Sequence, residues 1–452
     1  MSRHATLKPC DPKAMAESVN DRMRADWNQR AREDAHYFVA FGGLDQDEAG
    51  FLATAADVLR SLEGQLKRLP AAANRRAWRA LEIGCGPGRL IKPLSRHFGE
   101  IHGVDVSDEM IRLARERLAD IPHAHFHATN GASLAQFADD SFEFVYSYAV
   151  FQHIPSREVV LQYMREIRRV LKPGGVFHGQ FNGLPQEGDP DTWTGVAFSA
   201  EDIRVFTREN GLLLMYLEGE QTQYMWTTWC KALVPQPAPH NRPAAIRRIT
   251  NAFTSEPLIP QRGRLAALSI LIENLPADCD LNQLQVLADG TPGIGTYIGP
   301  VDSQGLQQVN AWLPDDVRTG LVPVELRRLN GGQNLPLCAP AMARIIPAGP
   351  LVPRVVSVTD GVNLVLQNAT KTGRVKVQIE EVISPDSITA TIDNQPVAHL
   401  HVYCTDRRPP RHTMDFEVPK GLKPGPHTLQ IRIGPRGLPP TNLEVGRYAS
   451  IG

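Results

Sequence analysis

Residues 81–89 read Leu-Glu-Ile-Gly-Cys-Gly-Pro-Gly-Arg, where an apolar run meets three glycines at alternate positions. The next residues, 90–97, suit a helix, and a short strand expected over residues 101–104 ends on Asp105. Strand, glycine turn, helix, strand and acid follow one another in this order in a mononucleotide-binding half-fold. Glycine lets the backbone approach a ligand closely, and a carboxylate can accept hydrogen bonds from both ribose hydroxyls. This order therefore predicts an α/β fold with a nucleoside site in the first half of the chain.

The spacing of the glycines distinguishes two kinds of nucleotide site. A dinucleotide site has the pattern Gly-x-Gly-x-x-Gly, with a helix N-terminus directed at the pyrophosphate. Here the third glycine comes one residue early, and Arg89 stands where that pattern needs glycine. This disfavours an NAD-dependent oxidoreductase. The pattern Gly-x-Gly-x-Gly preceded by Glu82 resembles motif I of the class I S-adenosylmethionine-dependent methyltransferases.

The resemblance continues in the family's order and covers roughly the first half of the chain. Ser107 is the expected N-cap of the helix after Asp105, and residues 130–133 stand where the family has its adenine-binding turn. The remaining expected elements are strands at 123–129, 141–148 and 176–181, helices at 161–171 and 201–209, and a final hairpin of 212–216 and 221–231. The implied fold is a Rossmann-like doubly wound sheet.

The resemblance implies S-adenosylmethionine as the cofactor. Asp105 is expected to hold the ribose and Met110 to lie near the adenine. The full set of implied cofactor-binding residues is Glu82, Gly84, Cys85, Gly86, Gly88, Asp105, Val106, Met110, Asn130, Gly131, Ala132, Tyr146 and Ser147.

Methyl transfer is an in-line displacement, in which the enzyme mainly supplies proximity and alignment. A general base is needed only when the acceptor is a poorly acidic hydroxyl or a protonated amine. The catalytic candidates are His153 and Tyr148, just beyond the fourth strand, where open α/β sheets place residues that face the substrate. A structural role for His153 in the turn before Pro155 stays open, and Gln152 and His178 are neighbouring candidates.

Three histidines, His123, His125 and His127, alternate along the third strand and are expected to face one side of it. A metal site is one interpretation. We favour polar side chains at a sheet edge, because no carboxylate or thiol completes a ligand set. We therefore predict no metal.

Four aromatic residues late in the α/β half have two interpretations. They are Trp193, Tyr224, Trp226 and Trp229. Aromatic side chains beyond the sheet's C-terminal edge would wall an acceptor pocket. Packing of the final hairpin is the other interpretation, and we favour it for Trp226 and Trp229.

Charge and cysteine content restrict the partners. The 452 residues include 48 Lys and Arg and 49 Asp and Glu, which gives no basic excess for nucleic acid or a membrane surface. No apolar run is long enough to span a bilayer, and the N-terminal residues are too polar for a signal peptide. Six cysteines are scattered without metal-type pairs, so we expect a reduced, cytoplasmic protein.

The chain changes character after its first half. We expect an N-terminal helical lid (1–60), a cofactor-binding domain (61–233), a proline-rich linker (234–244) and two β-sandwiches (245–350 and 351–452). Short β-rich runs alternate with turn residues in both sandwiches. Residues 309–324 and 416–429 share a sequence pattern that is typical of a hairpin. The pattern resembles immunoglobulin-like domains of the transcription-factor-associated type in bacterial multidomain proteins. We expect few contacts across the linker and treat residues 336–353 as a second proline-rich junction.

Two functions of different classes follow. The first is an S-adenosylmethionine-dependent methyltransferase that acts on an O or N atom of an unidentified acceptor. The sandwiches would then bind or present the acceptor, or bind a protein or glycan partner. A small molecule or glycan is favoured as acceptor, and a protein side chain stays open. The second is a non-catalytic cofactor-binding or scaffold protein; the intact Gly84, Gly86, Gly88, Asp105 and Asn130 favour the first.

Overall fold

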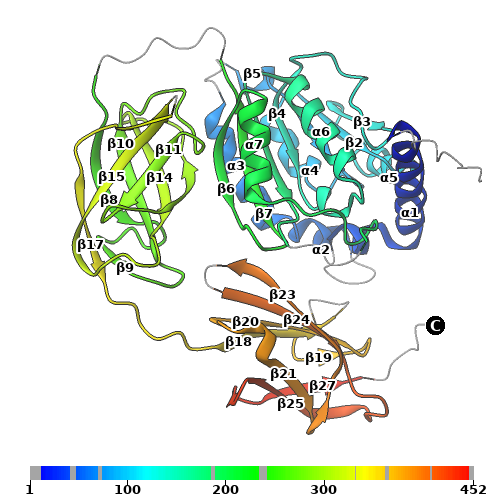
Figure 1. The fold of residues 1–452 in the computed structure, drawn as a ribbon. Helices are drawn as coiled ribbons and strands as arrows, with labels where there is room; N and C mark the ends of the chain where they lie inside the picture. The colour runs from blue at the N-terminus through cyan, green and yellow to red at the C-terminus, as the bar shows by residue number, and fades with distance from the viewer. Residues whose placement is uncertain are drawn as a thin grey trace, which may run out of the picture.

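The computed structural model describes residues 12–40, 47–69, 74–184, 189–233, 242–330, 332–361, 366–407 and 410–446. An α/β domain is followed by two all-β units, one beside the α/β domain and one beneath it (Figure 1). No helix within these ranges is long and apolar enough to cross a membrane.

The α/β domain is built on a sheet with the strand order β3-β2-β1-β4-β5-β7-β6. Its strands are β1 (Arg79–Ile83), β2 (Glu100–Asp105), β3 (Ala124–Ala128), β4 (Phe142–Ser147), β5 (Leu171–Phe181), β6 (Leu212–Glu218) and β7 (Met225–Lys231). Strands β1 to β5 pair in parallel, whereas β7 is antiparallel to both β5 and β6. The predicted doubly wound sheet and its final hairpin are confirmed.

Seven α-helices within the described residues accompany the sheet. They are α1 (Pro12–Ala40), α2 (Glu48–Ala53), α3 (Ala56–Gln65), α4 (Ile91–Leu94), α5 (Asp108–Arg117), α6 (Arg157–Val170) and α7 (Ala200–Glu209). Buried residues of α6 and α7 join the apolar cluster on one face of the sheet, and those of α3, α4 and α5 join the cluster on the other. In helix α6 the buried residues recur three or four positions apart, so they form one apolar side that packs against the sheet.

Helix starts follow the predicted capping residues. The Ser107 hydroxyl accepts the Met110 N–H at 3.1 Å at the start of α5. Ser199 and Asp202 form a capping box at the start of α7. The helix expected over residues 90–97 is shorter than predicted, because α4 ends at Leu94 and a 3₁₀ turn (Ser95–His97) follows.

The two all-β units repeat one topology. The first contains β8 (Ala245–Asn251), β9 (Leu258–Pro260), β10 (Ala267–Glu273), β11 (Leu284–Ala288), β12 (Thr291–Pro292), β13 (Ile294–Ile298), β14 (Leu306–Trp312), β15 (Gly320–Asn330), β16 (Gln333–Pro336) and β17 (Ala341–Ile346). The second contains β18 (Arg354–Asp360), β19 (Ala369–Thr370), β20 (Arg374–Glu380), β21 (Ile388–Ile392), β22 (Gln395–Pro396), β23 (Ala398–Arg407), β24 (Pro410–Glu417), β25 (Gly425–Ile433), β26 (Arg436–Gly437) and β27 (Thr441–Val445).

Each unit is a sandwich of two sheets, and every strand of the first has a counterpart numbered ten higher in the second. One sheet has the order β13-β14-β10-β8 in the first and β23-β24-β20-β18 in the second. The other has the order β12-β11-β15-β17-β9 in the first and β22-β21-β25-β27-β19 in the second. Even the single parallel pairing repeats, as β9 with β17 and β19 with β27. The chain therefore carries an internal duplication of one β-sandwich.

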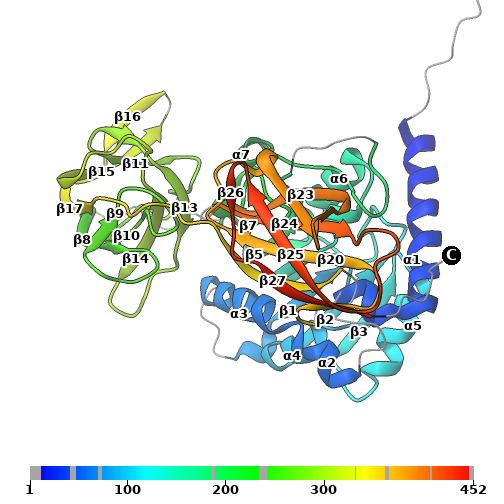
Figure 2. The ribbon, with the colours of Figure 1, turned by 90° about the horizontal axis from the view of Figure 1, so that it is seen from below.

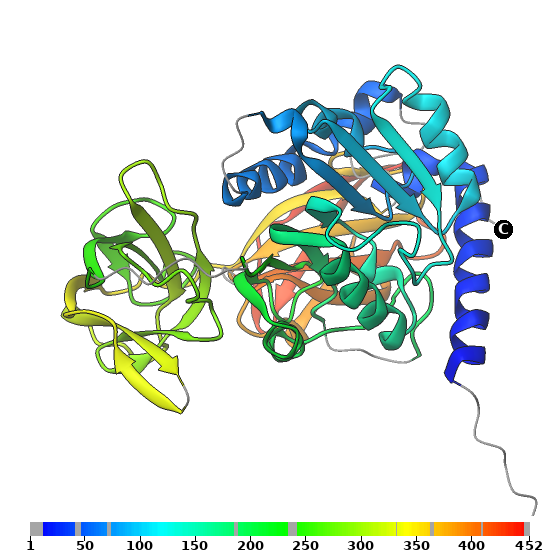
Figure 3. The same ribbon diagram turned by 90° about the horizontal axis from the view of Figure 1, so that it is seen from above.

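The first sandwich extends the sheet of the α/β domain. Strand β13 pairs with β6 at Tyr297 and Tyr216, so that one sheet runs through eleven strands from β3 to β8. Asp280, which is buried, accepts the Leu214 N–H at 2.9 Å, and the Leu281 N–H donates to the Leu214 carbonyl at 2.8 Å. Seen from above, this sandwich lies beside the α/β domain, on the side opposite α1 (Figure 3).

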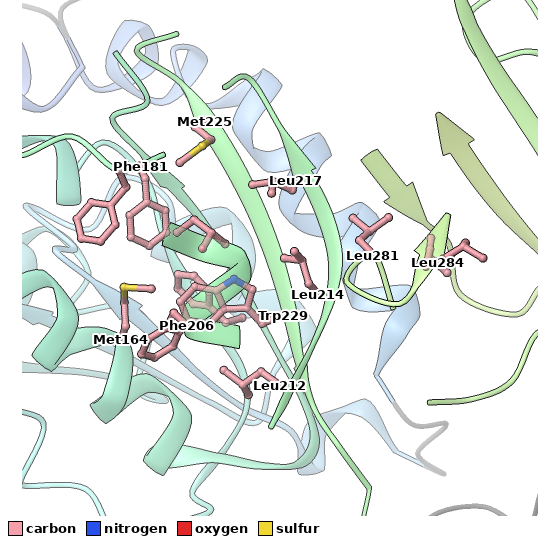
Figure 4. Close-up of a cluster of buried hydrophobic side chains, with 14 of the residues drawn as sticks. Met164, Phe181, Phe206, Leu212, Leu214, Leu217, Met225, Trp229, Leu281 and Leu284 are labelled. Atoms are coloured by element: carbon pink, nitrogen blue, oxygen red, sulfur yellow. The ribbon is translucent and has the colours of Figure 1, made fainter. Parts of the chain in front are cut away.

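Apolar packing crosses the same boundary. Leu281 and Leu284 of the first sandwich approach the Leu214 side of the α/β core, where Trp229 is fully buried (Figure 4). These residues belong to one apolar cluster. The expectation of few contacts between the cofactor-binding half and the β-rich half is therefore wrong, because β6 would otherwise be an open sheet edge.

Further sequence-based expectations need correction. Residues 341–346, assigned to a proline-rich junction, form β17. The segments 309–324 and 416–429 do not form the hairpins that their pattern predicts, because β14 and β15 lie in different sheets, as do β24 and β25. Most of the linker at 234–244 falls on residues outside the described ranges.

The interface predicts the effect of one substitution. Asp280 accepts the N–H groups of Leu214, Asn282 and Gln283, so Asp280→Ala leaves buried donors without partners. We expect the free energy of unfolding to fall by about 1–3 kcal/mol, measured as a lower melting temperature. Asp278→Ala is the control, because Asp278 is exposed and pairs with Arg328 on the surface. Equal melting temperatures for the two variants would contradict this account of the interface.

Candidate functional site

A tight turn joins β1 to α4. The N–H groups of Gly84 and Cys85 both donate to the Val104 carbonyl, at 2.8 and 3.0 Å, which ties the turn to β2. Gly84 has φ +68°, and a Cβ there would lie 2.3 Å from the Val150 side chain. Gly88 has φ +81°, and its Cβ would meet Leu118 at 2.6 Å. At these two positions the fold requires glycine.

The carboxylate of Asp105 holds this turn from the neighbouring strand. Its Oδ2 accepts the Gly86 N–H at 2.9 Å, and its Oδ1 accepts the Ser107 N–H at 2.9 Å. Burial raises the pKa of Asp105 to about 6, although these backbone hydrogen bonds favour the ionised form. A carboxylate has about four lone-pair positions, so it can still accept hydrogen bonds from a ligand.

A cavity opens at the carboxyl ends of β1, β2 and β4, where ligands bind in open α/β sheets. It is lined by Met23, Trp27, Phe38, Val39, Glu82, Ile83, Gly84, Cys85, Gly86, Arg89, Leu90, Asp105, Val106, Met110, Gly131, Tyr148, Ala149, Val150, His153, Ile154 and Tyr163. Three kinds of surface meet there: the glycine turn, the end of β2 with the start of α5, and the segment after β4.

Helix α1 forms one wall of the cavity and is fixed at both flanks. The side-chain oxygen of Asn28, Oδ1, accepts a hydrogen bond from the Ser107 hydroxyl at 2.8 Å, at the start of α5. Arg30 donates to the carbonyl and hydroxyl oxygens of Thr192 at 3.1 and 3.0 Å. The helix bends at Asp34, whose side chain accepts the Tyr37 N–H at 2.9 Å and so caps the last turn. That turn carries Phe38 and Val39, which line the cavity.

His153 lines the cavity but is only 6% exposed. Its Nδ1 lies 2.9 Å from the Trp193 carbonyl oxygen, which can only accept, so Nδ1 carries the proton. The Nε2 atom then accepts from the Gln152 amide at 3.2 Å. Burial lowers the pKa of His153 to about 4, so the ring is neutral at physiological pH and a weak base.

Tyr148 also lines the cavity and belongs, like His153, to the segment that follows β4. Its ring stacks on Trp226 with centroids 5.5 Å apart, and Trp226 stacks in turn on His178 at 4.8 Å. The guanidinium carbon of Arg89 lies 5.7 Å from the centre of the Tyr148 ring. Burial raises the pKa of Tyr148, which keeps its phenol protonated. Ala149, between Tyr148 and Val150, has φ +55°, a strained conformation of the kind that clusters at functional sites.

The structure brings most of the predicted site residues into this one cavity. Both catalytic candidates line it, as do Glu82, Gly84, Cys85, Gly86, Asp105, Val106, Met110 and Gly131. The lining does not include Gly88, Asn130, Ala132, Tyr146 and Ser147. Gly88 packs closely against Leu118, and Ala132 packs against the apolar core. The other three residues make hydrogen bonds within the protein.

Three of these residues show what their side chains do instead. The Asn130 side-chain oxygen accepts the N–H groups of Ala132 and Ser133, at 3.0 and 2.9 Å, and shapes its own turn. Tyr146 is fully buried and donates to Glu82 at 3.1 Å. The Ser147 hydroxyl donates to the Ile83 carbonyl at 3.1 Å.

The sequence predicts a helical lid at 1–60, but none of the residues that form this wall was among the predicted site residues, and Arg89 was noted only as a missing glycine. The polar residues Asn28 and Arg30, one turn or less from Trp27, were the available signal, since they fix the helix over the site.

The histidines of the third strand do not share one side. His125 and His127 lie against His102, with ring centroids 4.9 and 5.6 Å away. His123 precedes β3 and contacts the Ser95 carbonyl on the other face of the sheet. The expected common face is wrong, because the regular strand begins only at Ala124. Within the described residues no cluster of histidine, cysteine and acid could hold a metal ion.

Comparison with known families gives a match for part of this domain. Residues 81–178 match the family described as "Methyltransferase domain". Phosphoethanolamine N-methyltransferase 2 of Caenorhabditis elegans is 36% identical over 97 residues, which is 21% of this chain and 22% of that protein. Trans-aconitate 2-methyltransferase of Rhodopseudomonas palustris is 37% identical over 101 residues, 22% of this chain and 36% of that protein.

The matches are partial. The chain spans less than half the length of these curated relatives. Among solved structures, phosphoethanolamine N-methyltransferase 1 of Haemonchus contortus in complex with phosphoethanolamine and S-adenosylhomocysteine has a TM-score of 0.34 and 17% identity. That alignment covers 50% of this chain and 52% of that one. The assignment below therefore rests on the sequence matches.

The chain contains a methyltransferase domain, and its cofactor is S-adenosylmethionine. The cavity fits that molecule on three observations. Gly84 and Gly86 line the cavity with backbone that carries no side chain, which lets a ligand approach closely, and Asp105 has lone pairs free for ribose hydroxyls. Gly131 lines the cavity in the same way, as backbone without a side chain.

The raised pKa of Asp105 predicts how cofactor affinity depends on pH. Ribose hydroxyls donate to the ionised carboxylate, so the ligand binds the deprotonated form. Because the pKa is about 6, affinity for S-adenosylhomocysteine should be constant above pH 7. It should fall by up to about tenfold per unit below the pKa, as measured by calorimetry from pH 5 to 8.

Two variants test the assignment of this pH dependence. Asp105→Asn should bind more weakly and show a flatter profile over the same pH range. Asp108→Asn changes an exposed carboxylate on α5 and should keep the profile of the unaltered protein. A profile that is the same in Asp105→Asn and the unaltered protein would rule out Asp105 as the titrating group.

Proposed function

We propose that this chain is a methyltransferase that moves a methyl group from S-adenosylmethionine to an O or N atom of a small-molecule acceptor. The observation that carries the proposal is that one cavity contains the glycine turn, the Asp105 carboxylate and the two residues proposed to face the acceptor, His153 and Tyr148. A protein that only binds the cofactor would need the glycine turn and Asp105, but it would not need His153 and Tyr148.

The chain's own residues divide the work of binding. Asp105 would accept hydrogen bonds from the ribose, and Val106, Met110 and Gly131 would contact the adenine. Trp27 and Phe38 of α1 would exclude water from the opposite side. When bound, the cofactor supplies an activated methyl group, so the protein's remaining task is to align the acceptor.

His153 and Tyr148 suit positioning better than strong base catalysis. A neutral imidazole with a pKa of about 4 removes a proton poorly at neutral pH. The Tyr148 phenol stays protonated and can donate a hydrogen bond to an acceptor atom. The acceptor would therefore present a lone pair that is already free, as an ionised oxygen or a neutral amine does.

The relatives support a small acceptor. Their names mention phosphoethanolamine and trans-aconitate, and both of these are small molecules. The cavity lies within the α/β domain, which also suits a small molecule better than a protein side chain. A glycan stays possible as the ligand of the sandwiches.

We also propose that the two sandwiches, at 245–350 and 351–452, are immunoglobulin-like. With the main strands lettered A to G in chain order, the sheet positions β8, β10, β14 and β13 are strands A, B, E and D, and β11, β15 and β17 of the other sheet are strands C, F and G. The second sandwich has the same order ten strands later. This agreement in strand order supports the assignment.

The second sandwich would cover the open end of the cavity. In two views its β23 and β24 lie against the α/β domain near β7 (Figures 1 and 2). The Tyr224 phenol, in the β6–β7 turn, is close enough to interact electrostatically with both Tyr148 of the cavity and Tyr403 of β23. Tyr37, next to Phe38, interacts in the same way with Arg374 of β20. These electrostatic interactions connect the second sandwich with two segments near the cavity, which supports a role in acceptor selection.

The cysteines support a reduced compartment, and hence the cytoplasm. Cys85, Cys230, Cys279, Cys338 and Cys404 are free thiols, and these are all the cysteines of the described residues. Disulfides are rare in the cytosol.

A labelling experiment separates the enzyme from a non-catalytic cofactor-binding protein. The full chain is incubated with methyl-labelled S-adenosylmethionine and a pool of metabolites, and mass spectrometry finds any labelled product. We expect a labelled product and S-adenosylhomocysteine in equal amounts. Asp105→Ala should abolish both, whereas Asp108→Ala should leave both unchanged. Cofactor binding without either product, over a broad pool, would favour the scaffold function.

If the second sandwich covers the cavity, a change in it should affect acceptor binding but not cofactor binding, which can be measured once an acceptor is found. Tyr403→Ala should raise the KM for the acceptor several-fold, because the outer wall of the site is lost, and should leave the Kd for S-adenosylhomocysteine within about twofold. His399→Ala, an exposed change on the same strand, is the control. An unchanged KM in Tyr403→Ala would leave the second sandwich without a part in acceptor binding.

A further inference from the structure

Arg89 is a buried cation in the wall of the cavity. The side chain stands at the end of the glycine turn, is only 5% exposed and lines the cavity. One guanidinium nitrogen, Nη1, donates to the Thr54 hydroxyl at 2.9 Å. The Tyr148 ring lies near its guanidinium carbon. The Nε atom is buried and has no hydrogen-bond partner.

The surrounding residues do not neutralise this charge. Within the described part of the chain no carboxylate forms an ion pair with Arg89. Glu82 interacts with Arg89 electrostatically without forming an ion pair, and burial raises the pKa of Glu82 well above its usual range, which disfavours its charged form. A hydroxyl and an aromatic ring are weak partners for a guanidinium, which normally binds a planar anion through two N–H groups.

An uncompensated buried charge is costly to the folded chain. Such a group is expected where a ligand brings the missing partner. We propose that Arg89 is the anion-binding residue of the cavity, and that its guanidinium, which has a hydroxyl but no anion as a partner, holds a carboxylate or phosphate of a bound ligand. This inference rests on the proposed function, since it concerns the same cavity.

Two ligands could bring this anion. One is the cofactor, which carries a carboxylate on its amino-acid end. The other is the acceptor. The cofactor is favoured, because Arg89 directly follows Gly88 and lines the same cavity as Gly84 and Gly86.

The test compares three probes that differ only at the amino-acid end. S-adenosylhomocysteine has the carboxylate, its decarboxylated analogue lacks only that group, and 5′-methylthioadenosine lacks the whole amino-acid end. Affinities are measured by calorimetry for the unaltered protein, Arg89→Met and Arg89→Lys. Lys92→Met is the matched control, because it removes a partly exposed positive charge three residues further along the chain, in α4.

The unaltered protein should bind S-adenosylhomocysteine about 10- to 100-fold more tightly than the decarboxylated analogue, the range expected for a hydrogen bond between charged groups. In Arg89→Met that ratio should fall to about threefold or less, while Arg89→Lys keeps part of it. Affinity for 5′-methylthioadenosine should not change in any variant, which shows that the site is folded. Lys92→Met should behave as the unaltered protein does.

A second arm covers the acceptor as the source of the anion. With the protein saturated with S-adenosylhomocysteine, citrate and inorganic phosphate are titrated as probes. If the cofactor ratio is unchanged in Arg89→Met but either probe binds only when Arg89 is present, the anion comes from the acceptor. If neither the ratio nor probe binding depends on Arg89, the inference is overturned. Failure of the unaltered protein to bind any adenosine probe would instead refute the proposed function.

Discussion

The geometry of the site depends on the hydrogen bond from the Gly86 N–H to Oδ2 of Asp105. This contact joins the turn after β1 to the end of β2, and so fixes the distance between the two parts of the sheet that form the cavity floor. The Ser107 N–H holds the second carboxylate oxygen, and the Ser107 hydroxyl caps α5. One carboxylate therefore orients a loop and a helix start. The same two hydrogen bonds oppose the effect of burial, which raises the pKa of Asp105 only to about 6, so the group stays ionised at neutral pH.

The edge of the central sheet explains why the two sandwiches differ in use although they share one topology. Strand β6 would expose unpaired N–H and carbonyl groups, and β13 of the first sandwich pairs with it. The corresponding strand of the second sandwich, β23, lies beside the α/β domain, where Tyr403 is close enough to Tyr224 to interact electrostatically. The first sandwich is thus continuous with the fold of the α/β domain. The second shares no sheet with the α/β domain.

Local signals made much of the α/β domain predictable. The glycine turn, the acid at the end of β2 and the caps Ser107 and Ser199 act over a few residues, and the structure confirms the elements that they delimit. The direction of a side chain is not local information. A resemblance gives the position of Tyr146 along β4, but only packing turns that side chain to Glu82 and away from the cavity. Pairing between domains was also hidden, because β13 and β6 join through backbone groups that every sequence has.

Two buried charged side chains in this chain show how structural and ligand-binding roles differ in physical terms. Asp280 has a hydrogen bond to each carboxylate oxygen from the backbone around it, so its burial is compensated within the folded chain. Arg89 is similarly buried, but its Nε–H has no partner. An uncompensated guanidinium lowers the stability of the free protein, and a bound anion restores it, so ligand binding and stability are coupled through this residue. Such a group has no advantage in a purely structural core, where a residue like Met would fill the same space without the desolvation cost. Its presence beside the glycine turn is therefore better explained by the ligand than by the fold.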